Sequence, residues 1–327
     1  MRDLHGVPDA EHIADLFSDF LAGGKYLRSM FTYIGWRSRA PSSDSALRAA
    51  GSLELLHGFA LMQDDVMDGS TIRRGKPAVH VRLAEWHRRR ELSGSPERFG
   101  ASAAVVLGDL ALVWAEQMLR HSGLDSAAVD RAWPCYDQMR AELAIGQLAD
   151  LVNDARRVPS FEDVLAVARR KSGNYTVRNP LVLGALLAGC ESNVLDVFRV
   201  YGSLIGEAFQ LRDDLFGIFG RPAVTGKPTG EDLRDRKATT VVVLARELAS
   251  PHVRAHMDEL FAAADLTDAD LARSRELIRT TSAEEQVEEL ITQRVADALR
   301  VLSTAAIDET TRTALSDMAM RCTDRDR

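Results

Sequence analysis

The chain has 327 residues, of which 46% are hydrophobic and 27% are charged, and its formal net charge is −7. This composition is typical of a globular protein and argues against a general nucleic-acid-binding protein. The apolar runs are interrupted by charges before the ~20 residues of a membrane span, and the N-terminus lacks a signal-peptide profile. We therefore expect a cytoplasmic protein without a membrane span, whose three cysteines stay reduced.

Apolar residues recur with helical spacing along most of the chain, and no segment shows a convincing strand alternation. The clearest helical windows are residues 46–67, 101–119, 128–151, 194–219 and 284–302. Breaks rich in Gly, Pro or polar residues fall at 39–43, 68–77, 89–100, 156–160, 220–237 and 250–251. None of these breaks resembles a domain linker, so we predict one all-α domain over residues 1–327.

The first helical window ends in a cluster of aspartates, Asp64-Asp65-Val66-Met67-Asp68. Asp64 and Asp68 are four residues apart and share one helix face, and Asp65 lies close to that face. Two carboxylates about 4 Å apart repel by roughly 4 kcal/mol at an effective dielectric near 20, and a helix C-terminus disfavours anions further. The cluster therefore predicts a bound cation.

A second apolar window ends in Gln210-Leu211-Arg212-Asp213-Asp214. Like the first acidic segment, it is an apolar helix that ends in Asp-Asp. This similarity predicts that the two segments face one another across a shared cavity. Each acidic segment is followed by basic residues, Arg73-Arg74-Gly75-Lys76 after the first and Lys227 to Lys237 after the second. Carboxylates that hold Mg²⁺ beside arginines and lysines suit a diphosphate ligand.

A further basic pair indicates a second anion site. Lys25 and Arg28 are three residues apart at the predicted start of a helix, where backbone N–H groups also favour anions. His57 lies two helical turns before Asp64 and could point towards the same anion. The alternative for His57 is an ordinary hydrogen-bonded histidine of the core.

Taken together, these residues resemble the trans-isoprenyl diphosphate synthases. The similarity covers residues 23 to about 240 and rests on motifs in the family's order. The motifs are Gly23-Gly24-Lys25-x-x-Arg28, His57, Asp64-Asp65-x-x-Asp68, Arg73-Arg74-Gly75, Gly108-Asp109, Gly146-Gln147, Lys171, Phe209-Gln210-x-x-Asp213-Asp214 and Gly226-Lys227 to Lys237-x-Thr239. The resemblance implies an isoprenoid synthase fold, with antiparallel helices around a central active-site cavity, and a homodimer.

The resemblance also implies a role for each matching residue. Three Mg²⁺ ions and an allylic diphosphate would be bound by Asp64, Asp68 and Asp213. The same diphosphate would be held by Arg73, Lys171, Lys227 and Lys237, with Gln210 close to it. Isopentenyl diphosphate would be bound without metal by Lys25, Arg28, His57 and Arg74. The residues expected to take part in the chemistry are Asp64, Asp65, Asp68, Lys171, Gln210, Asp213 and Lys227.

The expected reaction is metal-assisted ionisation of the allylic diphosphate, followed by attack of the isopentenyl double bond on the carbocation. Product length would follow the depth of the apolar cavity below Asp64. Phe59 lies about 7.5 Å back along the helix axis and could form its floor, with the small Ala60 leaving room beside it. Phe59 could equally be ordinary core. An aromatic residue here resembles geranylgeranyl diphosphate synthases, so we predict a twenty-carbon product, with fifteen carbons as the alternative.

Two positions depart from the family pattern. Gly217 stands where a third aspartate of the second motif is common, which leaves that metal to Asp213, to Asp214 and to water. About 22 residues precede Gly23, which predicts a missing or shortened first helix.

Two other functions fit parts of the pattern. A terpene cyclase also uses an aspartate-rich motif and Mg²⁺. It acts on one diphosphate, however, so the second diphosphate site of Lys25, Arg28 and Arg74 would have no ligand. A noncatalytic partner subunit is suggested by Gly217 and the short N-terminus, and the full set of basic residues argues against it.

Overall fold

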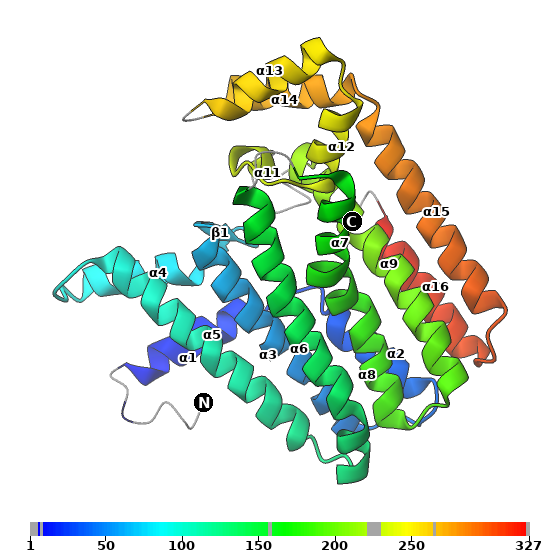
Figure 1. Ribbon diagram of the computed structural model, residues 1–327. Helices are drawn as coiled ribbons and strands as arrows, with labels where there is room; N and C mark the ends of the chain where they lie inside the picture. The colour runs from blue at the N-terminus through cyan, green and yellow to red at the C-terminus, as the bar shows by residue number, and fades with distance from the viewer. Residues whose placement is uncertain (1–5, 7–8, 156–158, 221–229, 264–265, 325–327) are drawn as a thin grey trace. The chain divides into compact units, whose positions relative to one another are not determined.

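The computed structural model describes residues 6, 9–155, 159–220, 230–263 and 266–324, and most of these residues are helical (Figure 1). The all-α prediction is confirmed, because each of the five predicted windows lies within a helix. By contacts the chain divides into two compact units, residues 1–29 with 43–124 and residues 30–42 with 125–327. Helix α2 (Leu27–Arg37) carries the chain from the first unit into the second.

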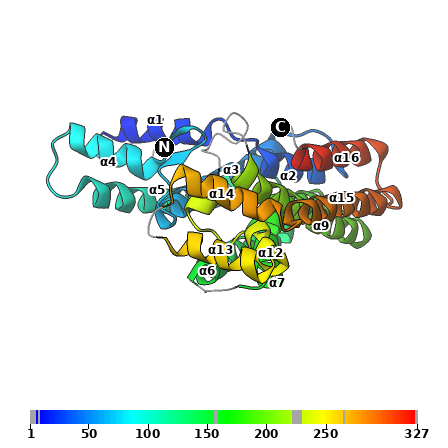
Figure 2. The same ribbon diagram turned by 90° about the horizontal axis from the view of Figure 1, so that it is seen from above.

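The first unit packs its helices around one apolar cluster. Its elements are α1 (Ala10–Leu21), α3 (Asp44–Met67), β1 (Ile72–Arg73), β2 (Lys76–Pro77), α4 (Val79–Arg89) and α5 (Pro96–Arg120). In both Figure 1 and Figure 2, α4 and α5 lie side by side. The short α1 buries Leu16, Phe17 and Phe20 in the cluster. A first helix of 12 residues is therefore present.

Side-chain caps set the starts of the long helices in this unit. The Ser95 hydroxyl accepts a hydrogen bond from the backbone N–H of Arg98 (3.2 Å), and Pro96 occupies the first turn. Helix α5 therefore begins at Pro96, and the predicted break at residues 89–100 is too long. Ser43 caps α3 in the same way, through the backbone N–H of Ala46.

Helix α5 is the one helix within the described part of the chain that is long and apolar enough to cross a membrane. This property differs from the expectation that charges interrupt every apolar run before the length of a membrane span. Ala104, Ala111 and Trp114 of α5 are nevertheless buried in the cluster of the first unit. This burial is what is expected of a helix inside a bundle, where the apolar face meets other helices.

The basic segment after the first acidic motif forms a small β-hairpin. Ile72 pairs with Pro77 and Arg73 pairs with Lys76 in an antiparallel register. Arg74 (φ 55°) and Gly75 (φ 72°) form the two-residue turn, and two left-handed residues in a row are typical of a type I′ hairpin turn. The structure thus contains a strand pair that the helical periodicity did not predict.

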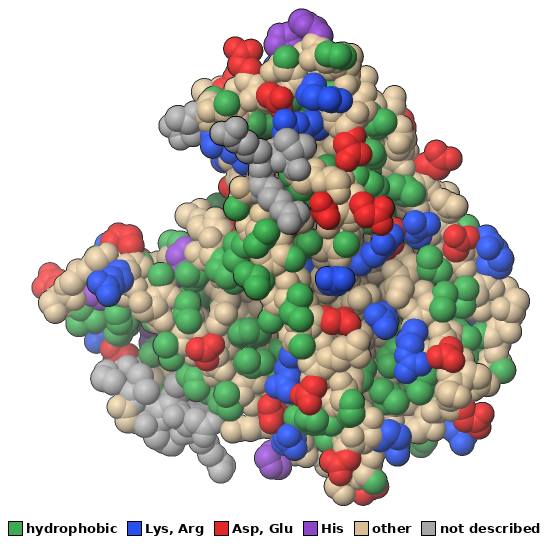
Figure 3. Space-filling view, viewed as in Figure 1, with side chains coloured by type: hydrophobic (Ala, Val, Ile, Leu, Met, Phe, Trp, Pro, Cys, Tyr) green, Lys and Arg blue, Asp and Glu red, His purple; other side chains and the backbone are tan. Residues whose placement is uncertain are grey.

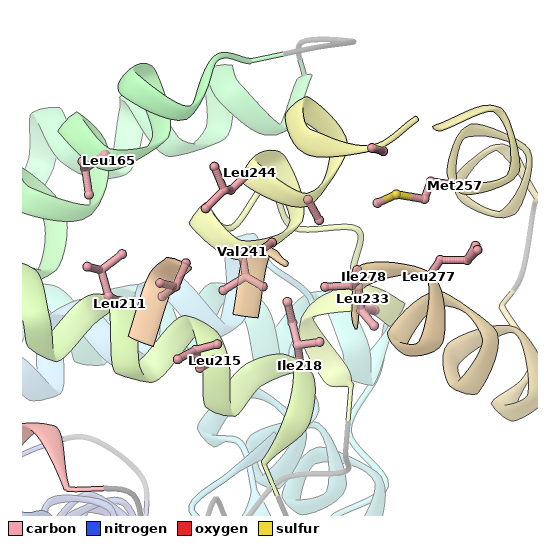
Figure 4. Close-up of a cluster of buried hydrophobic side chains, with 14 of the residues drawn as sticks. Leu165, Leu211, Leu215, Ile218, Leu233, Val241, Leu244, Met257, Leu277 and Ile278 are labelled. Carbon is pink, nitrogen blue, oxygen red and sulfur yellow. The ribbon is translucent and has the colours of Figure 1, made fainter. Parts of the chain in front are cut away.

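The second unit is a larger helical assembly. Its elements are α6 (Ser126–Ala155), α7 (Phe161–Ala168), the π-helix η2 (Arg169–Arg178), α8 (Asn179–Ala188), α9 (Ser192–Phe219), α11 (Glu231–Arg234), α12 (Thr240–Leu248), α13 (Pro251–Ala262), α14 (Asp268–Arg279), α15 (Ala283–Ser303) and α16 (Glu309–Thr323). Helix α15 runs beside α9 in both views (Figures 1 and 2). Figure 4 shows the apolar cluster that joins α9 to the C-terminal helices, with Leu215 and Ile218 of α9 beside Val241 of α12.

Glycines let the backbone of η2 approach its neighbours closely. A Cβ atom at Gly173 of η2 would lie 2.8 Å from the backbone carbonyl carbon of Gly206 in α9. A Cβ atom at Gly202 of α9 would lie 2.5 Å from Cα of Arg178. Real Cβ atoms do not come this near to backbone, so α9 and η2 meet at their main chains. This contact fixes the π-helix that carries Lys171.

Candidate active site

The first acidic motif lies at the C-terminal end of α3, as predicted. The backbone N–H of Asp68 donates to the carbonyl oxygen of Asp64 (2.8 Å), which places these two residues one helical turn apart. Both side chains are half-buried. Their carboxylates therefore share one face at the end of the helix and remain accessible to a ligand.

Asp65 differs from its two neighbours because it is buried and paired. Its side chain is 1% exposed, and its Oδ1 accepts hydrogen bonds from Nε (2.8 Å) and Nη2 of Arg73. Nη2 of Arg73 also lies 3.5 Å from Oδ2 of Asp64. The hairpin thus returns Arg73 onto the motif that precedes it, and Asp65 holds the guanidinium in place.

The three basic residues Arg28, His57 and Arg74 form a second grouping in the first unit. Nη1 of Arg74 donates to the carbonyl oxygens of Phe20 (3.1 Å) and Ala22 (3.3 Å) at the C-terminal end of α1. Burial lowers the pKa of Arg74 most, the charge of Glu54 opposes this shift, and the charges of Arg73 and Arg28 lower the pKa further. Because these arginines repel one another at close range, the grouping favours an anionic ligand. Lys25 is exposed and precedes α2.

The pKa of His57 lies well below its usual range, first because of burial and then because of the charges of Arg28, Arg74 and Arg73. We predict that His57 stays neutral at pH 6, where an ordinary histidine is mostly protonated. A bound anion favours the charged imidazole, so inorganic diphosphate should raise this pKa. The measurement is a pH titration of the His57 ring signals by NMR, with and without diphosphate. The exposed His252 is the control, and at a fixed pH its ring signals should be the same with and without diphosphate.

The second acidic motif lies near the end of α9, and its two aspartates have different surroundings. Asp213 is exposed, whereas Asp214 is buried. Oδ2 of Asp214 accepts hydrogen bonds from the backbone N–H (2.9 Å) and hydroxyl (2.6 Å) of Thr240, and Oδ1 accepts from Nε2 of Gln210 (2.7 Å). Burial raises the pKa of Asp214 to about 6, against the lowering effect of these hydrogen bonds. Asp214 therefore caps the start of α12, and Asp213 is the accessible carboxylate.

The predicted lysines of the second unit are placed as follows. Nζ of Lys171, on η2, donates to Oδ2 of Asp150 on α6 (2.6 Å). A Cβ atom at Gly146 would lie 2.8 Å from Cα of Lys171, so only a glycine lets α6 approach this part of η2. Lys237 is half-buried and follows α11, where its backbone N–H donates to the carbonyl oxygen of Asp232 (2.9 Å). Lys227 lies outside the described residues.

The donor set suits a hard cation such as Mg²⁺. All the candidate ligands are carboxylate oxygens, and Mg²⁺ takes one or two carboxylates together with phosphate oxygens and water. Within the described ranges, no group of three or more His, Cys, Asp or Glu side chains is arranged to hold a metal ion by itself. These residues fit an ion whose remaining ligands come from a bound diphosphate.

A family model of polyprenyl synthetases matches residues 10–278. The chain belongs to the polyprenyl synthetase family. The geranylgeranyl diphosphate synthase of Mycobacterium tuberculosis is 31% identical over 285 residues, covering 87% of this chain and 76% of that protein. The (2E,6E)-farnesyl diphosphate synthase of Mycobacterium bovis is 31% identical over 305 residues, covering 92% of this chain and 80% of that protein.

A crystal structure of geranylgeranyl pyrophosphate synthase from Corynebacterium glutamicum, complexed with isoprenyl diphosphate and magnesium, is similar to this polyprenyl synthetase with a TM-score of 0.93 and 39% identity. The similarity covers 98% of this chain and 92% of that chain. The resemblance drawn from the motifs and the isoprenoid synthase fold are thereby confirmed. The chain is an enzyme of the trans-prenyltransferase class.

In this polyprenyl synthetase, the predicted chain-length residues lie on the middle of α3. Phe59 is half-buried and packs against the cluster of the first unit, and Ala60 is half-buried beside it. Oδ1 of Asp109 accepts a hydrogen bond from Nε2 of Gln63 (2.9 Å), which links α5 to α3. Asp109 therefore makes a helix-to-helix contact.

Two buried charged residues near the second motif of this polyprenyl synthetase were missed from the sequence. Nη1 and Nη2 of Arg212 donate to the two carboxylate oxygens of Glu288 (2.6 and 2.8 Å), and Nε donates to the carbonyl oxygen of Thr323 (3.0 Å). Glu207 accepts from Arg169 (2.6 Å) and Arg294 (2.9 Å). These pairs hold α9 against its neighbours. In the sequence, both residues are charges inside the apolar helical window 194–219, and this pattern could have indicated buried ion pairs.

Proposed function

We propose that the enzyme condenses isopentenyl diphosphate with an allylic diphosphate in a head-to-tail trans elongation, with geranylgeranyl diphosphate as the product. The supporting observation is that the first unit carries two different anion environments. Asp64 and Asp68 offer carboxylates that need a metal to accept a diphosphate, whereas Arg28, His57 and Arg74 offer positive charge or hydrogen-bond donors directly. An enzyme acting on one diphosphate would have no use for the second environment.

The proposed roles follow the two environments. Asp64, Asp68 and Asp213 bind three Mg²⁺ ions with the allylic diphosphate. That diphosphate is also held by Arg73, Lys171, Gln210, Lys227 and Lys237, and the isopentenyl diphosphate by Lys25, Arg28, His57 and Arg74. We propose a single catalytic domain over residues 1–327.

The positive side chains would act on charge that develops during the reaction. As the allylic C–O bond breaks, its electron pair leaves with the diphosphate, and Arg73 and Lys171 stabilise the growing negative charge. Bound Mg²⁺ would supply the same stabilisation as a Lewis acid. The double bond of isopentenyl diphosphate then forms the new C–C bond, and the released diphosphate takes the proton that is lost.

The test of this proposal is an assay of the purified chain with isopentenyl diphosphate and each of the five-, ten- and fifteen-carbon allylic primers, with and without Mg²⁺. We expect a magnesium-dependent twenty-carbon diphosphate. A fifteen-carbon product is the second candidate, because the relatives are named for both products. Hydrocarbon release from geranylgeranyl diphosphate alone would support a terpene cyclase instead, and an inactive chain would support a partner subunit.

Phe59 is proposed to limit product length. Replacing Phe59 by Ala removes the ring from the middle of α3, so the apolar space deepens and longer products should appear. The measurement is product chain length by mass spectrometry. Phe99→Ala is the matched control, since Phe99 packs against the same cluster from α5 and should change stability without changing product length. An unchanged product distribution in Phe59→Ala would assign Phe59 to the core alone.

We propose a cytoplasmic homodimer without a membrane span. Ile145, Leu148 and Val152 share one face of α6 and are 55%, 63% and 44% exposed. Figure 3 shows hydrophobic side chains gathered over this helix. An exposed apolar face of this kind marks an interaction surface. Light scattering should give the mass of a dimer for the native chain and of a monomer for Leu148→Glu.

A further inference from the structure

The C-terminal end of α1 contacts the guanidinium of Arg74 through its backbone. Nη1 of Arg74 donates to the carbonyl oxygens of Phe20 (3.1 Å) and Ala22 (3.3 Å). The last carbonyl groups of a helix have no partner inside the helix and carry partial negative charge, so they favour a cation. A Cβ atom at Gly24 would lie 3.1 Å from Nη2 of the same guanidinium. Arg74 therefore lies against the segment that joins α1 to α2.

A carboxylate at the same end of α1 holds the second strand of the hairpin. Oδ1 of Asp19 accepts a hydrogen bond from Nζ of Lys76 on β2 (2.5 Å), and Oδ2 accepts one from Nη1 of Arg82 on α4 (2.7 Å). These hydrogen bonds, that of Lys76 first, hold the pKa of Asp19 below its ordinary value, so the carboxylate is charged near neutral pH. Asp19 thus connects α1 to the hairpin and to the helix that follows it.

The turn of the hairpin is anchored on both of its strands. On β1, Arg73 donates to the carboxylate of Asp65 on α3 (2.8 Å). On β2, Lys76, the strand partner of Arg73, donates to Asp19 on α1. Arg74 lies in the turn between them with a φ of 55°, a backbone conformation that a residue other than glycine keeps only where its surroundings hold it. The two anchors provide those surroundings.

We infer that Asp19 is a positioning residue for isopentenyl diphosphate, because its contacts with Lys76 and Arg82 fix the hairpin turn that presents Arg74. The inference rests on the proposed function, which assigns Arg74 to that diphosphate. Asp19 acts through the hairpin and touches no substrate. Its side chain is 39% exposed, and ion pairs with such exposure contribute little to folding. The loss of Asp19 should therefore affect substrate binding more than stability.

The test is steady-state kinetics of Asp19→Asn, with each substrate varied at a saturating concentration of the other and of Mg²⁺. We expect the KM for isopentenyl diphosphate to rise about fivefold, the upper range that an exposed ion pair supplies. This diphosphate keeps its charge during the reaction, and weaker binding of an unchanged group raises KM alone. Because Arg73 keeps its contact with Asp65, kcat and the KM for the allylic diphosphate should stay within about twofold of native.

Matched variants isolate the contact from its charge. Asp15→Asn removes the same charge from an exposed position one helical turn earlier in α1, and it should keep the native KM. Removing an acid would by itself favour an anionic substrate, so a higher KM in Asp19→Asn cannot come from net charge. Asp19→Glu retains a carboxylate and should stay within about twofold of the native KM. Thermal unfolding of each variant checks that the fold is kept.

A double-variant cycle shows whether Asp19 acts through Arg74. Arg74→Gln alone should raise the KM for isopentenyl diphosphate more than Asp19→Asn does, because it removes the binding group itself. In the Arg74→Gln background, Asp19→Asn should add no further rise, since no guanidinium is left to position. An equal rise in both backgrounds would give Asp19 a role independent of Arg74 and would overturn the inference.

The remaining outcomes separate this inference from the proposed function. A native KM in Asp19→Asn, or an equal rise in Asp15→Asn, overturns the role of Asp19. If the native chain elongates allylic primers, the proposed function stands in either case. A native chain that transfers no prenyl group contradicts the proposed function, and the role of Asp19 with it.

Discussion

Replacing Asp65 by Ala should lower the free energy of unfolding by about 3 kcal/mol or more. Asp65 is 1% exposed and its partner Arg73 is 16% exposed, so the substitution removes the hydrogen-bonded carboxylate from a largely buried guanidinium and leaves the longer 3.5 Å contact with Asp64. Breaking one side of such a pair is costly because the remaining charge stays desolvated. The measurement is equilibrium unfolding in urea, with product formation assayed on the folded fraction.

Two control variants isolate the cause of this loss. Asp68 belongs to the same motif but is only half-buried. Asp68→Ala should therefore leave the free energy of unfolding within about 0.5 kcal/mol of the native value. The double variant Asp65→Leu with Arg73→Met removes both charges and should recover much of the stability. Equal destabilisation by Asp65→Ala and Asp68→Ala would contradict the assignment of Asp65 as the structural member of the motif.

Replacing Asp213 by Ala should lower kcat by about 100- to 1000-fold, as expected when one group that stabilises developing charge is removed. Asp213 is exposed, so the fold should lose little stability. Its neighbour provides the contrast. Asp214→Ala removes the acceptor of hydrogen bonds from Thr240 and Gln210 and should cost about 2 kcal/mol of stability. Steady-state kinetics and urea unfolding on both variants check the pair.

The reverse pattern would exchange the two roles. If Asp214→Ala lost most of its turnover while remaining fully stable, and Asp213→Ala stayed active, the accessible carboxylate of the second motif would be Asp214. The buried hydrogen bonds of Asp214 argue for the first pattern, since an acceptor that already serves Thr240 and Gln210 has little capacity left for a ligand.

The sequence predicted the long helices well because each carries an apolar stripe over many turns. The predicted windows at residues 46–67 and 194–219 end where α3 and α9 end. The start of α5 was placed five residues late, because Ser95 and Pro96 determine it through a local cap that apolar periodicity does not register. The π-helix η2 was not predicted, since its form depends on the close approach of Gly173 to Gly206 from a distant segment.

The residues of the candidate site were predicted from the sequence. Which of its aspartates are buried and structural, and which are accessible to a ligand, was not predicted. Both acidic motifs were recognised from spacing, yet spacing makes Asp64 and Asp65 look alike. Burial separates them, and burial depends on the hairpin that brings Arg73 back to α3. Asp19 belongs to the N-terminal segment in which a missing or shortened helix was predicted. Only the fold of the hairpin and α4 brings two basic side chains to its carboxylate.

The glycine contacts between α9 and η2 limit how this enzyme can be altered. At Gly202, Gly206 and Gly173 even one added methyl group meets main-chain atoms, which cannot rotate away as a side chain would. Random mutagenesis for altered product spectra should therefore recover almost no survivors at these codons, while Phe59 and Ala60 accept many replacements. A mutant library that leaves these three glycines unchanged would place its substitutions at positions where the variants can still fold.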